Sequence, residues 1–139
     1  MNIRIFMGAT LMLLTAAISH AETVLIGNPG LHFSSLPLSQ VSRIFLGQTS
    51  QLPDGGAAIP LDVSGGSREQ FYRDVLKKSP EQIEKYWARM IFTGKAQPPR
   101  EVRPGDVKSV VAETPGAISY IDSSKVDGSV KVIHIDASH

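Results

Sequence analysis

The residues best suited to hold a ligand are two serines, two glycines and an arginine in one short run, Ser64-Gly65-Gly66-Ser67-Arg68. Backbone N–H groups at the start of a helix have no partner inside the helix and lie at the positive end of its dipole, so such a turn favours an anion. The two hydroxyls and the guanidinium would add donors. We therefore predict an oxyanion site at these five residues, with the capping of a helix as the alternative explanation.

The residues on either side of this run predict the elements that position it. The apolar segment Ile59–Val63 before it is typical of a short strand, and two apolar pairs after it recur at helical spacing. Ser67 and Gln70 have the S-x-x-Q spacing of a capping box, which predicts a helix from Ser67 to about Lys78. The run would then be the turn between a strand and a helix.

Catalysis and metal binding have little support in the sequence. The segment Gly65–Glu69 departs from the G-x-S-x-G nucleophile motif at its last position, which leaves an esterase-like hydrolase as a third alternative only. His32 and His134 lack the spacing of metal ligands, and the chain contains no phosphate-binding loop of the Walker type. We therefore predict a non-enzymatic protein with no cofactor and no metal.

The N-terminal residues predict export from the cytoplasm. Arg4 is followed by an apolar run, and small residues precede Glu22, as in a secretory signal peptide that covers residues 1–21. No second hydrophobic stretch follows, so we expect a periplasmic chain without a membrane span. The formal charge of +1 falls to zero when Arg4 is removed, which argues against a nucleic-acid partner. The chain has no cysteine, which excludes disulfides and a lipid anchor on a thiol.

The remaining pattern predicts a single α/β domain over residues 22–139, with a small mixed sheet in two or three layers. Trp87 falls on the apolar face of the most regular helix, and Tyr120 falls in a strand where its hydroxyl needs a partner. The expected strands cover residues 23–27, 59–63, 117–121 and 130–135, and the expected helices cover residues 39–46, 67–78, 80–91 and 106–113.

Several short segments appear in an order that is typical of one family. They are Ile44-Phe45-Leu46-Gly47, the Ser/Gly turn, Phe92-Thr93-Gly94-Lys95 and the stretch from Thr114 to Tyr120. Together with the predicted signal peptide, they make the chain resemble the phosphate ABC-transporter substrate-binding proteins, which have the type 2 periplasmic-binding-protein fold. The resemblance extends from about Val24 to Ile121.

This resemblance implies a fold and a site. In that family an anion lies in a cleft between two lobes, and a Ser-Gly-Thr type turn at a helix N-terminus supplies hydrogen bonds. The matching positions are Ser64, Gly65, Gly66 and Ser67, with Arg68 beside them. The turn here reads Ser-Gly-Gly-Ser, and the chain has the length of one lobe, so the opposing wall of the cleft is not part of it. A homodimer or another protein could supply that wall.

The function that follows from the resemblance is periplasmic binding of phosphate or a related oxyanion, as the substrate-binding component of an ABC transporter. The partners would be the anion and a transporter permease or another envelope protein. The alternative is a lobe that has lost its ligand and serves as a protein-interaction module. An exposed apolar patch would favour the alternative.

Overall fold

The structure is a computed structural model that describes residues 22–137, so the predicted signal peptide lies outside the described residues. Its centre is a six-stranded mixed sheet with the strand order β2-β6-β1-β5-β3-β4. In this sheet β1 runs antiparallel to both β5 and β6, while the pairs β2–β6, β3–β4 and β3–β5 are parallel. The strands are β1 Thr23–Gly27, β2 Ser35–Pro37, β3 Ile59–Val63, β4 Arg100–Val102, β5 Ala117–Asp122 and β6 Lys131–Asp136.

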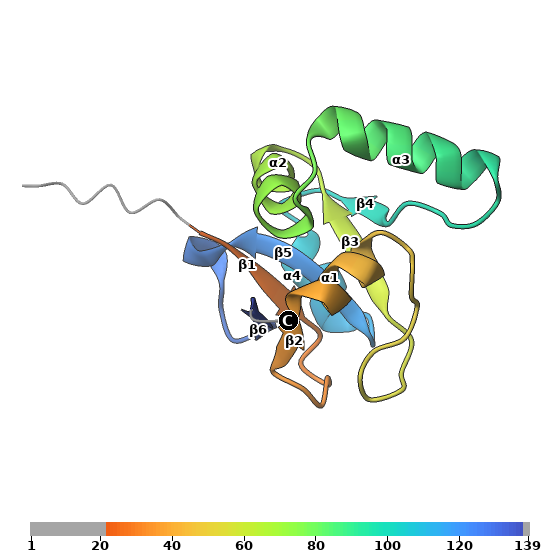
Figure 1. Cartoon of the computed structure of the whole chain (residues 1–139). Helices are drawn as coiled ribbons and strands as arrows, with labels where there is room; N and C mark the ends of the chain where they lie inside the picture. Colours follow the sequence, from red (N-terminus) through yellow and green to blue (C-terminus); the bar gives the residue numbers. More distant parts are fainter. Residues whose placement is uncertain (1–21, 138–139) are drawn as a thin grey trace, which may run out of the picture.

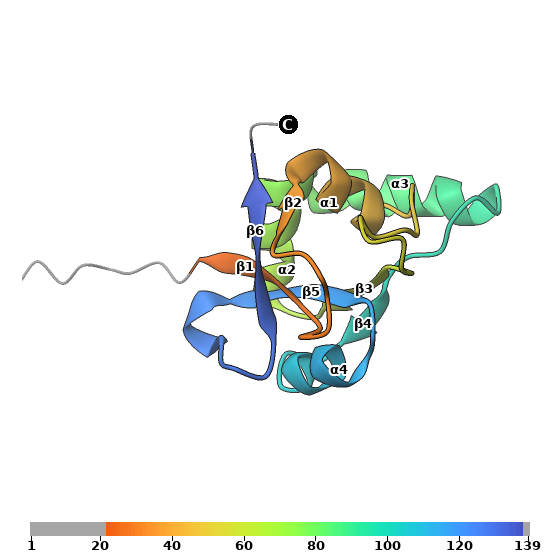
Figure 2. The same ribbon diagram turned by 90° about the horizontal axis from the view of Figure 1, so that it is seen from below.

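Helices cover both faces of the sheet, which gives three layers. Figure 2 shows α4 on one side of the sheet and α1 and α2 on the other. The helices are α1 Leu38–Phe45, α2 Gly66–Phe71, α3 Pro80–Phe92 and α4 Val107–Glu113. A π-helical turn, Tyr72–Leu76, continues α2, and a 3₁₀ turn, Ser123–Lys125, follows β5. The predicted α/β class with a small mixed sheet is confirmed.

Three aromatic rings join the sheet to the helices on one face. The ring of Tyr120, on the central strand β5, stacks on that of Phe71 with centroids 4.1 Å apart. Phe45 of α1 meets Phe71 edge to face at 4.9 Å. All three side chains are buried, so β5, α1 and α2 share one core.

Most predicted elements occur where the sequence places them. The strands at residues 23–27 and 59–63 agree residue for residue, and the capping box of α3 is present, because Ser79 Oγ accepts from the Gln82 N–H at 3.2 Å. The predicted Trp87 position in the core is confirmed. The strands β2 and β4 were not predicted, since three residues are too few to show a period.

The helix α3 lies away from the sheet, above the end of α1 (Figure 1). It is held there by the Tyr86 hydroxyl, which donates to the Leu46 carbonyl, and by the Trp87 ring, which packs at Gly47. Because only one side of α3 is covered, its last residues are exposed, to 50% for Ile91 and 91% for Phe92. Within residues 22–137 no helix is long and apolar enough to cross a membrane.

Candidate functional site

The predicted oxyanion turn lies between β3 and α2. Gly65 precedes the helix with φ at 108°, a backbone conformation that residues with a side chain rarely adopt, and α2 therefore begins at Gly66. The Ser64 N–H donates to the Val102 carbonyl of β4 at 3.1 Å, and the Arg68 N–H donates to the Gly65 carbonyl at 3.2 Å. The turn is thus tied to the sheet on one side and to the helix on the other.

The predicted capping box at this helix is wrong. The cap residue is Gly65, no side chain caps the helix, and Gln70 instead accepts a hydrogen bond from the Thr23 hydroxyl at 2.9 Å. The reason is the glycine conformation, which starts the helix before Ser67 and puts that residue inside the first turn. The predicted helix is also interrupted, since its second half is π-helical and ends at Leu76 with Lys77 left-handed at φ 56°.

This start leaves several donors without a partner. The N–H groups of Gly66 and Ser67 lie in the first turn, where a helix offers no carbonyl to accept from them. Neither the Ser64 nor the Ser67 hydroxyl forms a hydrogen bond with any described residue, and both residues are partly exposed. The turn therefore keeps unused hydrogen-bond donors that solvent can reach.

The guanidinium of Arg68 is fixed by a buried carboxylate. Its Nε lies 3.0 Å from Asp62 Oδ2, and its central carbon lies 5.1 Å from the centroid of the Tyr72 ring. The Asp62 side chain is only 6% exposed, whereas the Arg68 side chain is 40% exposed. The guanidinium is therefore anchored at one end, and its exposed part can donate to a second partner.

Two tyrosine hydroxyls complete the surroundings of Asp62. Tyr72 donates to Oδ2 at 2.6 Å, Tyr120 donates to Oδ1, and the Val63 N–H also donates to Oδ1, at 3.1 Å. These donors come from β3, β5 and the turn after α2. A carboxylate buried at this depth requires such a set of donors, because an unpaired buried charge is strongly destabilising.

The same contacts shift the pKa values of three side chains. Burial raises the pKa of both Tyr72 and Tyr120 far above the ordinary tyrosine value, and the negative charge of Asp62 raises each further. Burial alone would lower the pKa of Arg68, but the Tyr72 hydroxyl and the Asp62 charge outweigh it, and the net shift is upward. All three side chains therefore keep their protons at neutral pH.

Sequence reasoning missed Asp62 and Tyr72 as parts of this site. A single charge in the otherwise apolar strand Ile59–Val63 was the available signal, because such a charge must find partners when the strand is buried. For Tyr120 the need for a hydroxyl partner was predicted, and the structure identifies that partner as Asp62.

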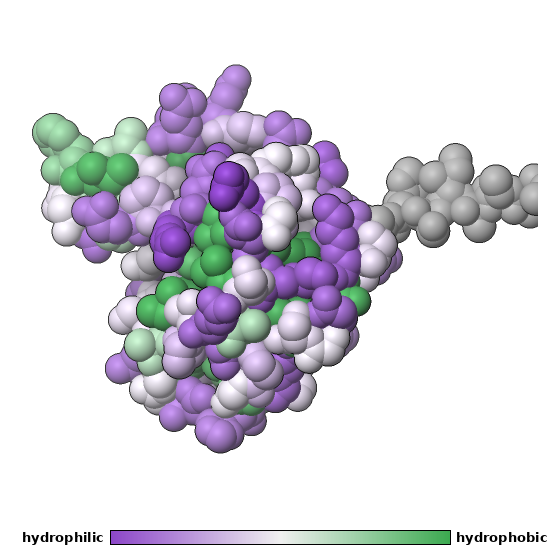
Figure 3. Space-filling view, turned by 180° about the vertical axis from the view of Figure 1, so that it is seen from behind, coloured by the Kyte–Doolittle hydropathy of each residue, from purple (hydrophilic) through white to green (hydrophobic). Residues whose placement is uncertain are grey.

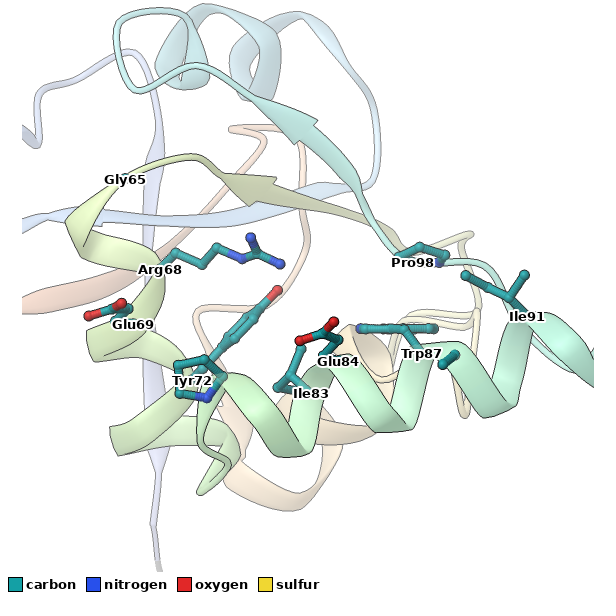
Figure 4. A pocket seen from close by; sticks show the side chains of 11 residues that line it. Gly65, Arg68, Glu69, Tyr72, Ile83, Glu84, Trp87, Ile91 and Pro98 are labelled. Atoms are coloured by element: carbon teal, nitrogen blue, oxygen red, sulfur yellow. The ribbon is translucent and has the colours of Figure 1, made fainter.

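A pocket of about 700 Å³ opens between α2 and α3 (Figure 4). Gly65 and Arg68 border it, whereas Ser64, Gly66 and Ser67 do not. Its other wall comes from α3, and the close-up shows the Arg68 guanidinium and the Tyr72 hydroxyl on the side facing that helix. Besides Arg68 and Tyr72, the lining includes apolar residues (Pro80, Ile83, Trp87, Ala88, Ile91, Pro98) and the carboxylates of Glu69 and Glu84.

The geometry offers no support for catalysis or for metal binding in the part of the chain that the structure describes. The Ser67 hydroxyl forms no hydrogen bond with a histidine or a carboxylate there, and residues 22–137 contain no group of three or more potential metal ligands. What the turn can do chemically is donate hydrogen bonds.

No family model matches the chain, but its fold is found in solved structures. A phosphate ABC transporter substrate-binding protein with bound phosphate from Clostridium perfringens matches 84% of this chain at 21% identity, with a TM-score of 0.62. An ABC-type phosphate transport receptor from Vibrio cholerae matches 81% of this chain at 17% identity, with a TM-score of 0.61. PstS from Borrelia burgdorferi matches 84% of this chain at 14% identity, with a TM-score of 0.62.

These matches confirm the predicted resemblance at the level of fold. The chain spans 46%, 45% and 48% of the three neighbours, which is less than half of each. The length of the chain therefore corresponds to about one of the two lobes of such a protein. At these identities the likeness establishes the fold alone.

Proposed function

We propose that this chain binds phosphate or a related oxyanion, without chemical conversion, at the turn Ser64-Gly65-Gly66-Ser67-Arg68. The observation that carries the proposal is the set of unused donors at the start of α2, namely two backbone N–H groups and two hydroxyls beside an anchored guanidinium. The fold neighbours support it, because they are phosphate transport proteins and one of them holds phosphate.

The charges around the turn limit the affinity that we expect. The Arg68 charge is already matched by Asp62, so an anion would be held mainly by neutral hydrogen bonds. The chain also spans less than half of each phosphate-transport neighbour. We therefore propose weak binding, near the millimolar range that corresponds to about −4 kcal/mol.

A periplasmic location and delivery of the anion to an ABC-transporter permease are further parts of this proposal. They rest on the predicted signal peptide over residues 1–21 and on the fold neighbours. The competing proposal is a protein-interaction module, which the exposed apolar end of α3 favours.

The test is a calorimetric titration of the purified protein with phosphate and with sulfate. The variant is Ser64→Ala combined with Ser67→Ala, because these hydroxyls have no partner in the fold and their loss should leave stability unchanged. Each hydrogen bond to a charged group contributes about 1.5–3 kcal/mol, so loss of both would remove most of the roughly −4 kcal/mol of binding, and saturable heat should disappear in the double variant. Ser50→Ala, at an exposed serine outside the turn, is the control. Absence of saturable heat from the unchanged protein at millimolar anion, or equal affinity in the double variant, would refute the site.

A further inference from the structure

We propose that α3 is the interface of a homodimer, in which the α3 helices of two copies pack antiparallel across a two-fold axis near Ala88. The proposal rests on the shape and the charges of this helix, and it does not depend on oxyanion binding.

The last turn of α3 carries the most exposed large apolar side chain of residues 22–137. Phe92 is 91% exposed and its neighbour Ile91 is 50% exposed, compared with 38% for Ile59 and 47% for Val132 elsewhere. The green tip at the upper left of Figure 3 shows that apolar residues gather where this end of the molecule projects. An exposed aromatic residue on a projecting helix is typical of an interaction surface.

The hollow that such a side chain would fill lies along the same helix. Pro80, Ile83 and Trp87 form part of the pocket between α2 and α3, and Glu84 stands at its edge. Phe92 follows Ala88 by four residues and Glu84 precedes it by four. A two-fold rotation about Ala88 therefore brings Phe92 of the partner subunit to the pocket edge at Glu84, and the same contact forms twice.

The charges on α3 are arranged for an antiparallel pair. On α3, Glu81, Glu84 and Lys85 precede Ala88 and Arg89 follows it, while Lys95 lies in the turn just beyond the last helical residue, Phe92. Of these residues, Glu81, Glu84, Arg89 and Lys95 form no ion pair with another described residue. Reversal of one helix brings Glu81, in the first turn of α3, to the C-terminal end of the partner's α3, where Lys95 follows the last helical residue. Antiparallel packing also aligns the two helix dipoles favourably.

The spacing of residues along α3 places a stripe of side chains where the partner helix would make contact. Glu84, Ala88 and Ile91 recur at intervals of four and three residues, which is the interval of helix pairs that pack side by side. The alanine at the centre allows the two backbones to approach closely. Lys85, three positions before the axis, would lie over the partner's Ile91 with its aliphatic stem.

The size of this surface sets the strength that we expect. The helix has 13 residues and is therefore about 20 Å long, so the pair buries an area at the low end of stable interfaces. We therefore expect a dimer that dissociates on dilution. Arg68 borders the same pocket, so the partner's Phe92 would also partly cover the proposed oxyanion turn.

The first test uses the absence of cysteine from the chain. Ala88→Cys places one thiol on the proposed axis, where it meets its own copy, and mild oxidation should give a disulfide-linked dimer rapidly. Val132→Cys, on an exposed residue of β6, is the matched control and should cross-link only by slow random collision. Equal rates in the two variants would overturn the proposal.

The second test identifies the orientation by sedimentation equilibrium across about 1 µM to 1 mM protein, a range suited to a small interface. Glu81→Lys alone and Lys95→Glu alone should each weaken the dimer, and both changes in one chain should restore it. Phe92→Glu should weaken it by about 30-fold or more, as loss of an aromatic residue that anchors an interface does. A monomer at every concentration, or a dimer whose dissociation constant is the same in all these variants, would overturn the proposal. A concentration-independent tetramer or larger species would overturn it as well, because it would need a different surface.

Discussion

The Nε of Arg68 lies 3.0 Å from Oδ2 of Asp62, so the one cation of the proposed oxyanion turn already has a carboxylate partner. This pair joins the end of β3 to the first turn of α2, and Tyr72 and Tyr120 add hydrogen bonds from two further elements. Its first role is therefore to hold the turn in place. A ligand would use the donors that the pair leaves free.

Loss of the carboxylate charge should destabilise the protein. In Asp62→Asn the half-buried Arg68 keeps its charge but loses the partner, and the two tyrosine hydroxyls lose a charged acceptor. Breaking a fully buried pair costs about 3–5 kcal/mol, and solvent around Arg68 should reduce this to about 2–3 kcal/mol. The measurement is the free energy of unfolding from denaturant titration.

The control for this variant is Asp106→Asn, which removes the partner of Arg103 from an exposed pair with the same 3.0 Å separation. An exposed pair contributes about 0–1 kcal/mol, so this change should have a small effect. A loss of stability in Asp62→Asn no larger than in the control would contradict the role assigned to the buried carboxylate.

The buried tyrosines predict how stability changes at high pH. The pKa of Tyr72 and that of Tyr120 are raised by burial and by Asp62, so the folded protein keeps two protons that the unfolded chain releases near the ordinary value of 10.0. This contribution is fully present below that pH and is lost as pH rises above it. The free energy of unfolding should therefore fall in alkaline solution.

The measurement is phenolate absorbance during an alkaline titration of Tyr86→Phe, which leaves only Tyr72 and Tyr120 of the three tyrosines. No phenolate should appear until circular dichroism shows that the chain unfolds. Ionisation near pH 10 with the fold intact would contradict the prediction. In Tyr72→Phe the alkaline loss of stability should be smaller.

Much of the fold could be predicted from the sequence because its signals are local. The strand Ile59–Val63 and the helix that begins at Pro80 each depend on residues close in the chain. The strands β2 and β4 escaped prediction since each has three residues and exists only through pairing with a distant strand.

The site was harder to predict because its contacts join distant positions. The Tyr120 hydroxyl reaches Asp62 across 58 residues of sequence, and no spacing rule connects them. The capping box predicted at Ser67 and Gln70 shows the converse. The S-x-x-Q spacing is present, but the box does not form, because Gly65 starts the helix earlier and Gln70 accepts a hydrogen bond from the distant Thr23. Whether the turn binds an anion remains a prediction for calorimetry.

Asn28 predicts a second point of high sensitivity, on the opposite face of the sheet. Its buried side-chain amide donates to the carbonyls of Val111, Ala112 and Thr114 at 3.0–3.1 Å, and its oxygen accepts from the Gly30 N–H. Asn28 thereby supplies hydrogen bonds to carbonyl groups at the C-terminal end of α4, which have no partner inside the helix. Asn28→Ala should cost about 1–3 kcal/mol, as buried acceptors left unpaired do.

The comparison variant at this position is Asn28→Asp. A carboxylate oxygen would replace the donor and would face the carbonyl oxygens at the negative end of α4, so this near-isosteric change should destabilise more than alanine does. Thermal unfolding of both variants checks the order. A milder effect for aspartate would mean that the amide serves through packing and not through its hydrogen bonds.

The glycines at the start of α2 should respond in opposite ways to the same substitution. Gly65 has φ at 108°, so Gly65→Ala should cost about 1–3 kcal/mol through backbone strain, although a Cβ there would meet nothing nearer than Pro104 at 3.9 Å. Gly66 lies inside the helix with open space around it, and Gly66→Ala should be neutral or stabilise by up to about 1 kcal/mol. Denaturant unfolding of the two variants measures the difference. Equal effects would show that the turn does not require the glycine conformation at Gly65. They would also contradict the explanation that this conformation starts the helix early and thereby leaves the Ser67 hydroxyl free.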